Sequence, residues 1–129
     1  MDTNMSANKK TLLIDGVGTF QWDDDHWEST PTALDGAVIN IDAVAISPDQ
    51  QARAAALCAN WQEVVAQCLA YIELRRKDYR LKAVEFNDPD VFIDDQDEWT
   101  VYFGTEEEFD QLVGVEFRCN DPLQLIIGD

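Results

Sequence analysis

A long helical pattern occupies the middle of the chain, from Ser47 to Tyr79. Its apolar residues recur three or four positions apart and therefore share one face, which we expect to be buried. Ser47 and Gln50 are spaced for a capping box, and Pro48 suits the first helical position because its missing N–H needs no partner there. The apolar positions are Leu57, Trp61, Val64, Val65, Cys68 and Ile72.

The sequence leaves the continuity of this helix open at Asn60. Asn60 and Glu63 are spaced as a second capping box, which would begin a new helix there. The apolar positions nevertheless keep their helical phase across this point. The pattern is therefore consistent with one long helix, or with two helices at about 48–58 and 61–77.

Shorter segments on both sides of the helix have the strand pattern, in which apolar and polar residues alternate. Pro31 lacks a ladder donor and would place its strand at a sheet edge. A short helical turn is expected at 105–111. This order predicts an α+β fold: a mainly antiparallel sheet with one long or broken helix packed on one face. The predicted strands are 12–14, 19–22, 27–32, 37–45, 81–86, 91–93, 99–103, 113–119 and 123–127.

The length of 129 residues fits one domain. We expect residues 1–10 to form a flexible tail and residues 11–129 to form a single α+β domain. The N-terminal residues lack the apolar stretch of a signal peptide, and no apolar run is long enough to cross a bilayer, so we expect a cytoplasmic location. The cysteines, Cys58, Cys68 and Cys119, have no metal-binding spacing and are expected to be buried thiols.

The composition is strongly acidic, with 26 Asp and Glu residues against 9 Lys and Arg and a formal net charge of −17. Nucleic acid and anionic membranes are poor partners for such a chain, since binding to phosphate groups depends on Lys and Arg. A basic protein is a better partner, because an acidic field speeds its association. The charge could also serve solubility alone. We expect a monomer or a homodimer.

The charges are segregated along the chain. No Lys or Arg lies between Lys10 and Arg53, or between Lys82 and Arg118, although both stretches are rich in acids. The basic residues of 75–82 are expected to complement the helix dipole and to hold the fold together. We interpret the acidic stretches as surfaces for a basic partner, with an exposed aromatic residue as an anchor. The predicted partner-binding residues are Asp23, Asp24, Asp25, Trp27, Asp94, Asp95, Asp97, Glu98, Glu106, Glu107 and Glu108.

Catalytic and metal-binding patterns are weak. The acids around Asp94 lack the glycine and the spacing of an EF-hand, so no calcium site is predicted. His26 is the single histidine; the three aspartates before it should raise its pKa, and it has no nucleophile pattern nearby. We therefore predict a non-enzymatic protein without metal or cofactor. The alternatives are a structural or oligomerisation domain and a small hydrolase, which would show a pocket with carboxyl groups of raised pKa.

Several short patterns occur together along the chain. They are Phe20-Gln21-Trp22, Asp35-Gly36 before Val38, Ile39 and Ile41, Ser47-Pro48-Asp49-Gln50, Asn60, Gly114-Val115-Glu116-Phe117 and Ile126-Ile127-Gly128-Asp129. This layout resembles small uncharacterised bacterial α+β domains that are similar to immunity proteins of polymorphic or contact-dependent toxin systems. The resemblance implies a non-enzymatic α+β domain that binds one cognate protein, and it assigns no role to an individual residue. Together with the acidic charge, it leads us to expect an immunity protein that neutralises a basic toxin such as a nuclease.

Overall fold

A computed structural model describes residues 10–106, 108–109 and 111–128. The tail predicted at 1–10 thus lies outside the described residues except for Lys10. Eight strands form one sheet and lie side by side in chain order. They are β1 (Thr11–Ile14), β2 (Gly18–Asp23), β3 (His26–Ser29), β4 (Val38–Ile41), β5 (Asn87–Ile93), β6 (Glu98–Gly104), β7 (Leu112–Arg118) and β8 (Asp121–Gly128). The short helix η1 (Thr32–Leu34) precedes β4, and the long helix α2 (Pro48–Arg75) follows it.

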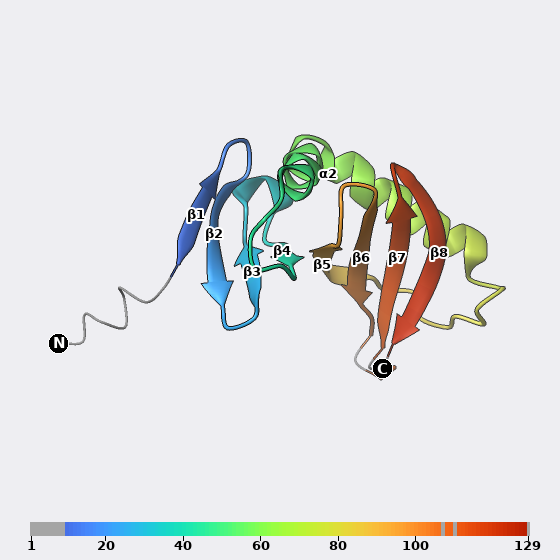
Figure 1. The fold of residues 1–129 in the computed structure, drawn as a ribbon. Helices are drawn as coiled ribbons and strands as arrows, with labels where there is room; N and C mark the ends of the chain where they lie inside the picture. The colour runs from blue at the N-terminus through green and yellow to red at the C-terminus, as the bar shows by residue number, and fades with distance from the viewer. Residues whose placement is uncertain (1–9, 107, 110, 129) are drawn as a thin grey trace.

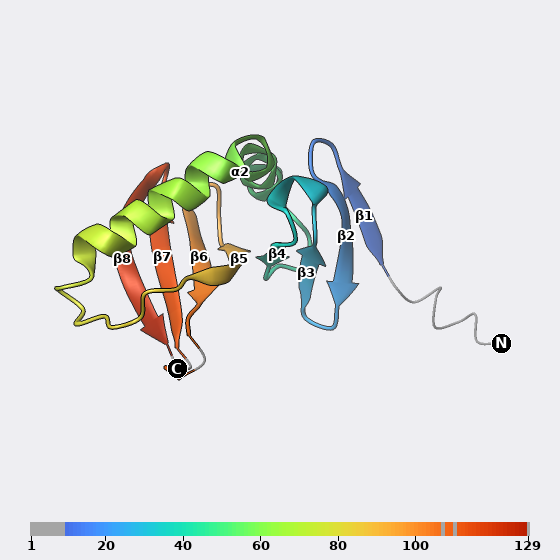
Figure 2. The same ribbon diagram turned by 180° about the vertical axis from the view of Figure 1, so that it is seen from behind.

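The topology consists of two antiparallel halves joined by one parallel pair. Neighbouring strands run antiparallel except β4 and β5. These two are parallel because α2 connects them, as parallel strands need a crossover segment. The helix lies in front of β6–β8 in Figure 2 and behind them in Figure 1, so it covers one face of these strands. The predicted α+β class, a mainly antiparallel sheet with one helix on one face, is confirmed.

The helix α2 begins where its sequence predicts, and it bends at Asn60, where the sequence left one helix or two open. The Ser47 hydroxyl accepts from the Gln50 N–H at 3.1 Å, and the Gln50 side chain accepts from the Ser47 N–H at 2.9 Å, which completes the capping box. Asn60 has non-helical dihedral angles, φ −130° and ψ 24°, and its side-chain amide donates to the Ala56 carbonyl at 3.0 Å. The stretch is thus one helix with a kink at Asn60. None of the described helices combines the length and apolarity needed to cross a membrane.

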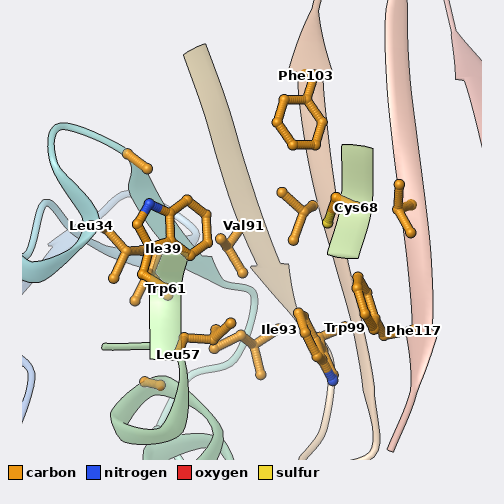
Figure 3. Close-up of a cluster of buried hydrophobic side chains, with 14 of the residues drawn as sticks. Leu34, Ile39, Leu57, Trp61, Cys68, Val91, Ile93, Trp99, Phe103 and Phe117 are labelled. Atoms are coloured by element: carbon orange, nitrogen blue, oxygen red, sulfur yellow. The ribbon is translucent and has the colours of Figure 1, made fainter. Parts of the chain in front are cut away.

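The main core lies between α2 and the sheet (Figure 3). Leu57, Trp61 and Ile72 of the predicted apolar helix face are buried there. They meet alternate residues of the strands, including Trp99 and Phe117, whose rings stack at 4.0 Å between centroids and 7° between planes. The period of two along the strands and the helical spacing of α2 therefore meet in one continuous core.

Several predicted strands differ from those observed. The strand expected at an edge, 27–32, is the shorter β3, which pairs with β2 on one side and β4 on the other. Pro31 lies after β3, at the start of η1, where its missing N–H costs no ladder bond. The strand expected at 37–45 is limited to β4, and residues 81–86 form no strand. The turn expected at 105–111 lies partly outside the described residues.

The cysteines occupy three different environments. Cys68 is buried against the sheet, and this burial raises the pKa of its thiol to about 12. Cys58 is half-buried, and its pKa is also raised by burial. Cys119 is exposed in the turn between β7 and β8, with a φ of 57°, so the expectation that all three thiols are buried is wrong there.

Candidate functional site: the acidic face of the sheet

The face of the sheet opposite α2 carries most of the acidic strand residues. Alternate side chains of a strand point to opposite faces, so the positions between the buried residues form this face, which we call the uncovered face. Arg118 is the only Lys or Arg within the eight strands. The acidic residues on the uncovered face and its rim are Asp23, Glu28, Asp42, Asp88, Asp90, Asp94, Glu98 and Glu116.

A groove of about 530 Å³ runs over β5 and β6 on this face. The strand register places Asp90 beside Tyr102 and Phe92 beside Thr100. Phe92 is 44% exposed, although it is a large apolar residue. Its ring meets the Tyr102 ring edge-on, with 5.6 Å between centroids and 89° between planes. We call this hollow the aromatic groove; its lining includes Asp90, Phe92, Asp94, Thr100, Tyr102 and Leu112.

Gly114 supports the Tyr102 ring from the neighbouring strand. The two residues are paired in the register of β6 and β7. A Cβ atom at position 114 would lie only 2.7 Å from the Tyr102 Cε1 atom, closer than real Cβ contacts allow. The ring therefore occupies the space that a side chain at this position would fill. Glycine is required here for close packing of the ring rather than for an unusual backbone conformation.

Partial burial raises the pKa of two carboxyl groups in the groove. Burial raises the pKa of Asp90, and the charges of Asp88 and Glu28 add to the effect, while a hydrogen bond from the Val38 backbone opposes it. Burial likewise raises the pKa of Asp94, which also faces the negative charges of Glu98, Glu116 and Asp42. The charged forms of both groups are thus less favoured than in open solvent, and a cation in the groove would relieve the repulsion between them and their neighbours.

A second hollow of about 230 Å³ lies next to the aromatic groove and shares Phe92 with it. His26 lines it, and its ring nitrogens lie 2.8 Å from the Asp25 carboxylate and 3.1 Å from the Glu28 carboxylate. The hydrogen bond with Asp25 is the main cause of a raised His26 pKa, as the sequence predicted, and Glu28 adds to it. Asp23, His26 and Glu28 each place a ligand atom within 4.8 Å of the others, and the hydrogen bond between His26 and Glu28 accounts for one of these approaches.

The turn between β5 and β6 is held in place by the first part of α2. The Gln50 side chain, which belongs to the capping box, donates to the Asp94 carbonyl at 3.1 Å. Arg53 is only 8% exposed, and its guanidinium lies 4.8 Å from the centroid of the Trp99 ring. It donates to the Gln96 carbonyl at 2.7 Å, to Asn120 Oδ1 at 3.1 Å and to the Cys119 carbonyl at 3.2 Å. The helix therefore orients the acidic turn.

The predicted acidic residues fall into two exposed turns. Asp23, Asp24 and Asp25 lie where β2 turns into β3, and 94–97 lies between β5 and β6, with Glu98 as the first residue of β6. Asp25 and Asp94, far apart in the sequence, line the two hollows that share Phe92. Asp95, Asp97 and Glu98 are exposed, and the Asp95 side chain accepts from the Gln96 N–H at 2.7 Å.

Trp27 is not the exposed aromatic that we expected beside the first turn. It is 7% exposed, and its indole N–H donates to the Val44 carbonyl at 3.1 Å. Its ring packs edge-on against Trp22, with 5.5 Å between centroids. The reason is its strand position opposite Ile41, which places it among the core residues. The exposed aromatic near the acids is Phe92.

The remaining predicted residues lie in the segment after β6. The Glu106 carboxylate accepts from the Val84 N–H, at 2.9 Å for the closer oxygen, and from the Glu85 N–H at 3.1 Å. Burial acts to raise the pKa of Glu106, but these backbone hydrogen bonds outweigh it and the pKa is lowered. The Glu106 carboxylate thus bonds the segment before β5, and it also carries a negative charge. Glu107 lies outside the described residues, and Glu108 is exposed.

The sequence contained a signal for the aromatic groove that we did not use. Asp88, Asp90, Phe92 and Asp94 occupy every second position and line the same hollow. Val91 and Ile93, between them, are fully buried. Alternation along β5 therefore places Phe92 on the acidic side of the strand. The contribution of Tyr102 could be found only from the pairing of β5 with β6.

Comparisons with known proteins give no relative for this chain: no family model matches it, and neither a curated protein nor a solved structure is significantly similar. The function has therefore to be inferred from the geometry and the electrostatics of the uncovered face.

Proposed function

We propose that the chain is an acidic, non-enzymatic module that binds one basic protein through the uncovered face of its sheet, as an immunity protein would neutralise a cationic toxin such as a nuclease. The observation that carries the proposal is the concentration of acidic residues on one face of the sheet. α2 covers the other face (Figures 1 and 2), and the strands contribute to the uncovered face most of their acidic residues and one basic residue, Arg118.

The basic residues of the chain support this assignment by their contacts. Arg53 is used inside the fold, and Arg76 donates to the Leu81 and Ala83 carbonyls at 3.0 and 2.8 Å. Arg75 pairs with Asp78 at 2.8 Å at the end of α2. Arg75 and Arg76 stabilise the helix end and the following segment, as the sequence predicted for the cluster at 75–82. They leave the acids of the uncovered face to interact with a partner.

The proposal is tested by affinity capture from a lysate of the source cells. We expect one basic protein to be recovered in a stoichiometric complex and to be released by about 0.5 M salt, because exposed charges are screened at this ionic strength. The activity of the recovered protein should be inhibited by one equivalent of the chain. Recovery of no basic partner, or of a partner whose binding is insensitive to salt, would contradict the proposal.

A carboxylate hydrolase is the second candidate, because Asp90 and Asp94 line one groove and both have a raised pKa. Their spacing argues against a catalytic pair. They are four residues apart on one extended segment, so their Cα atoms are about 13 Å apart, whereas the paired carboxyl groups of glycosidases are about 5–9.5 Å apart. A screen with glycoside and ester substrates distinguishes the two: turnover that is lost in Asp90→Asn would favour the enzyme.

An oligomerisation domain would need a free sheet edge, and α2 and the segment after it occupy one of the two edges. Tyr71 donates to the Leu123 carbonyl of β8 at 3.0 Å, and the Leu125 N–H donates to the Tyr79 hydroxyl at 3.3 Å. These tyrosines bind backbone groups that a second copy would need for strand pairing. We therefore expect a monomer in light scattering. A dimer that dissociates when β1 is altered would favour the oligomerisation domain.

A further inference from the structure

We propose that the aromatic groove binds an arginine side chain of the basic partner, with the guanidinium over Phe92 and between the flanking charges of Asp90 and Asp94. This inference rests on the proposed function and specifies the part of the uncovered face that anchors the complex. It is carried by the exposed aromatic pair and by the groove that surrounds it.

The aromatic pair is built into the strand pairing. The Tyr102 ring packs on Gly114, as the short distance to a Cβ at that position shows, and the Phe92 ring meets it edge-on at 89°. Gly114 thus supports the Tyr102 ring, and Phe92 is the exposed ring of the pair. A ring held in this way loses little side-chain entropy when a ligand stacks on it, which is a property of aromatic anchors in binding sites.

The charges of the groove match a cation rather than a neutral ligand. Asp90 and Asp94 flank Phe92 at the alternate positions of one extended segment, and all three line the hollow. The described residues of this lining include no Lys or Arg. Partial burial raises the pKa of both aspartates, and the described lining of the groove supplies no opposite charge, so a cation would stabilise their ionised forms.

Arginine fits the aromatic groove better than lysine does. Its guanidinium is planar, is weakly hydrated, stacks on aromatic rings and donates hydrogen bonds in the ring plane to carboxylates. A lysine ammonium would satisfy the carboxylates but would gain less from Phe92. The same chain shows the preference inside its fold, where the Arg53 guanidinium lies over the Trp99 ring.

The test compares the binding of hexa-arginine and hexa-lysine peptides by calorimetry in about 50 mM salt, where surface charges act over more than 10 Å. We expect the arginine peptide to bind about three- to tenfold more tightly to the unaltered chain. Phe92→Leu, which keeps an apolar side chain of strand character, should reduce this ratio to about twofold or less. Phe92→Tyr, which keeps the ring, should retain it. Thermal unfolding of each variant establishes that it is folded.

The carboxylates are tested with a matched pair of double variants. Asp90→Asn with Asp94→Asn should weaken both peptides at least about fivefold, because two nearby charges are lost. Glu63→Gln with Glu85→Gln removes the same charge from exposed positions on α2 and in the segment before β5, and should weaken them by less than about twofold. An unchanged arginine preference in Phe92→Leu, or equal effects of the two double variants, would overturn the anchor.

Failure of the anchor and failure of the proposed function give different results. A basic partner that binds Phe92→Leu as tightly as the unaltered chain removes the arginine anchor and leaves the protein-binding module intact. If the chain binds the arginine peptide selectively but captures no basic partner, the arginine site exists and the proposed function is wrong.

Discussion

Replacing Arg53 with alanine should destabilise the protein more than any other single change of a basic residue that is described above. The guanidinium makes three hydrogen bonds to the β5–β6 and β7–β8 turns and lies over Trp99. Burial lowers the pKa of Arg53, with the charge of Asp97 acting in the opposite direction, so its placement in the fold costs hydration energy. These opposing terms set the size of the effect.

The magnitude follows from the contacts. Hydrogen bonds from a charged donor contribute about 1.5–3 kcal/mol each, but the turns are exposed and water replaces part of this, so we take about 1 kcal/mol for each of the three. The contact with Trp99 adds about 0.5–1 kcal/mol. The loss of packing of the aliphatic stem and the recovered hydration energy of the charge oppose each other. We therefore expect the free energy of unfolding to fall by about 3.5–4 kcal/mol, or the Tm by about 14 °C in a domain of this size.

Urea denaturation and hydrogen exchange measure this prediction together. Arg75→Ala is the control, because Arg75 pairs with Asp78 at the surface and its loss should leave the free energy of unfolding close to that of the unaltered chain. Arg53→Ala should also speed the exchange of the Cys119 amide, which donates to the Asp97 carbonyl at 2.7 Å across the two turns. A loss below about 1 kcal/mol with unchanged exchange would refute the claim that Arg53 holds the acidic turn.

Three further predictions test the electrostatics and the packing of the uncovered face. Asp94→Asn should raise the free energy of unfolding at neutral pH by up to about 0.5 kcal/mol, measured by urea denaturation. The pKa of Asp94 is raised in the folded state, so its ionisation costs stability as the pH rises from the unfolded pKa of about 3.9 through the folded pKa, and asparagine removes this cost. NMR titration should give His26 a pKa above about 6.5. The stabilisation that this group contributes is complete below the unfolded pKa of about 6.5 and is lost as the pH rises through the folded pKa. In His26→Gln the free energy of unfolding should not show this change with pH. Gly114→Ala should cost about 1–3 kcal/mol and shift the Tyr102 ring resonances, because the new methyl group displaces the ring.

Local sequence patterns were sufficient for the helix and its ends. The capping box of Ser47 and Gln50 and the interruption at Asn60 depend on neighbours within four residues, and the structure contains both. Trp27 shows where this reasoning stops. Its place beside an acidic turn suggested exposure, but its pairing with Ile41 of β4 puts it in the core. Burial of a strand residue depends on its partners across the sheet.

The acidic turns and the acidic side of β5 were predictable from the sequence, but the complete aromatic groove was not. Charge segregation marked Asp25 and Asp94 without showing that they line adjoining hollows. Their approach depends on the parallel pairing of β4 with β5, which α2 makes possible and which no local pattern encodes. The interaction of Tyr102 with Gly114 likewise joins two strands. Sequence reasoning finds such sites only when strand order and register are known.

The location of the acidic binding surface is tested most directly by two charge reversals of equal size. Asp95→Lys with Glu98→Lys changes exposed residues at the β5–β6 turn, and Glu63→Lys with Glu85→Lys changes exposed residues outside the uncovered face. Each pair alters the net charge equally, so a difference between them reports position alone. In affinity capture from the source lysate, the account predicts that the control pair recovers the same basic protein as the unaltered chain and that the turn pair does not. Equal recovery by both pairs would contradict it.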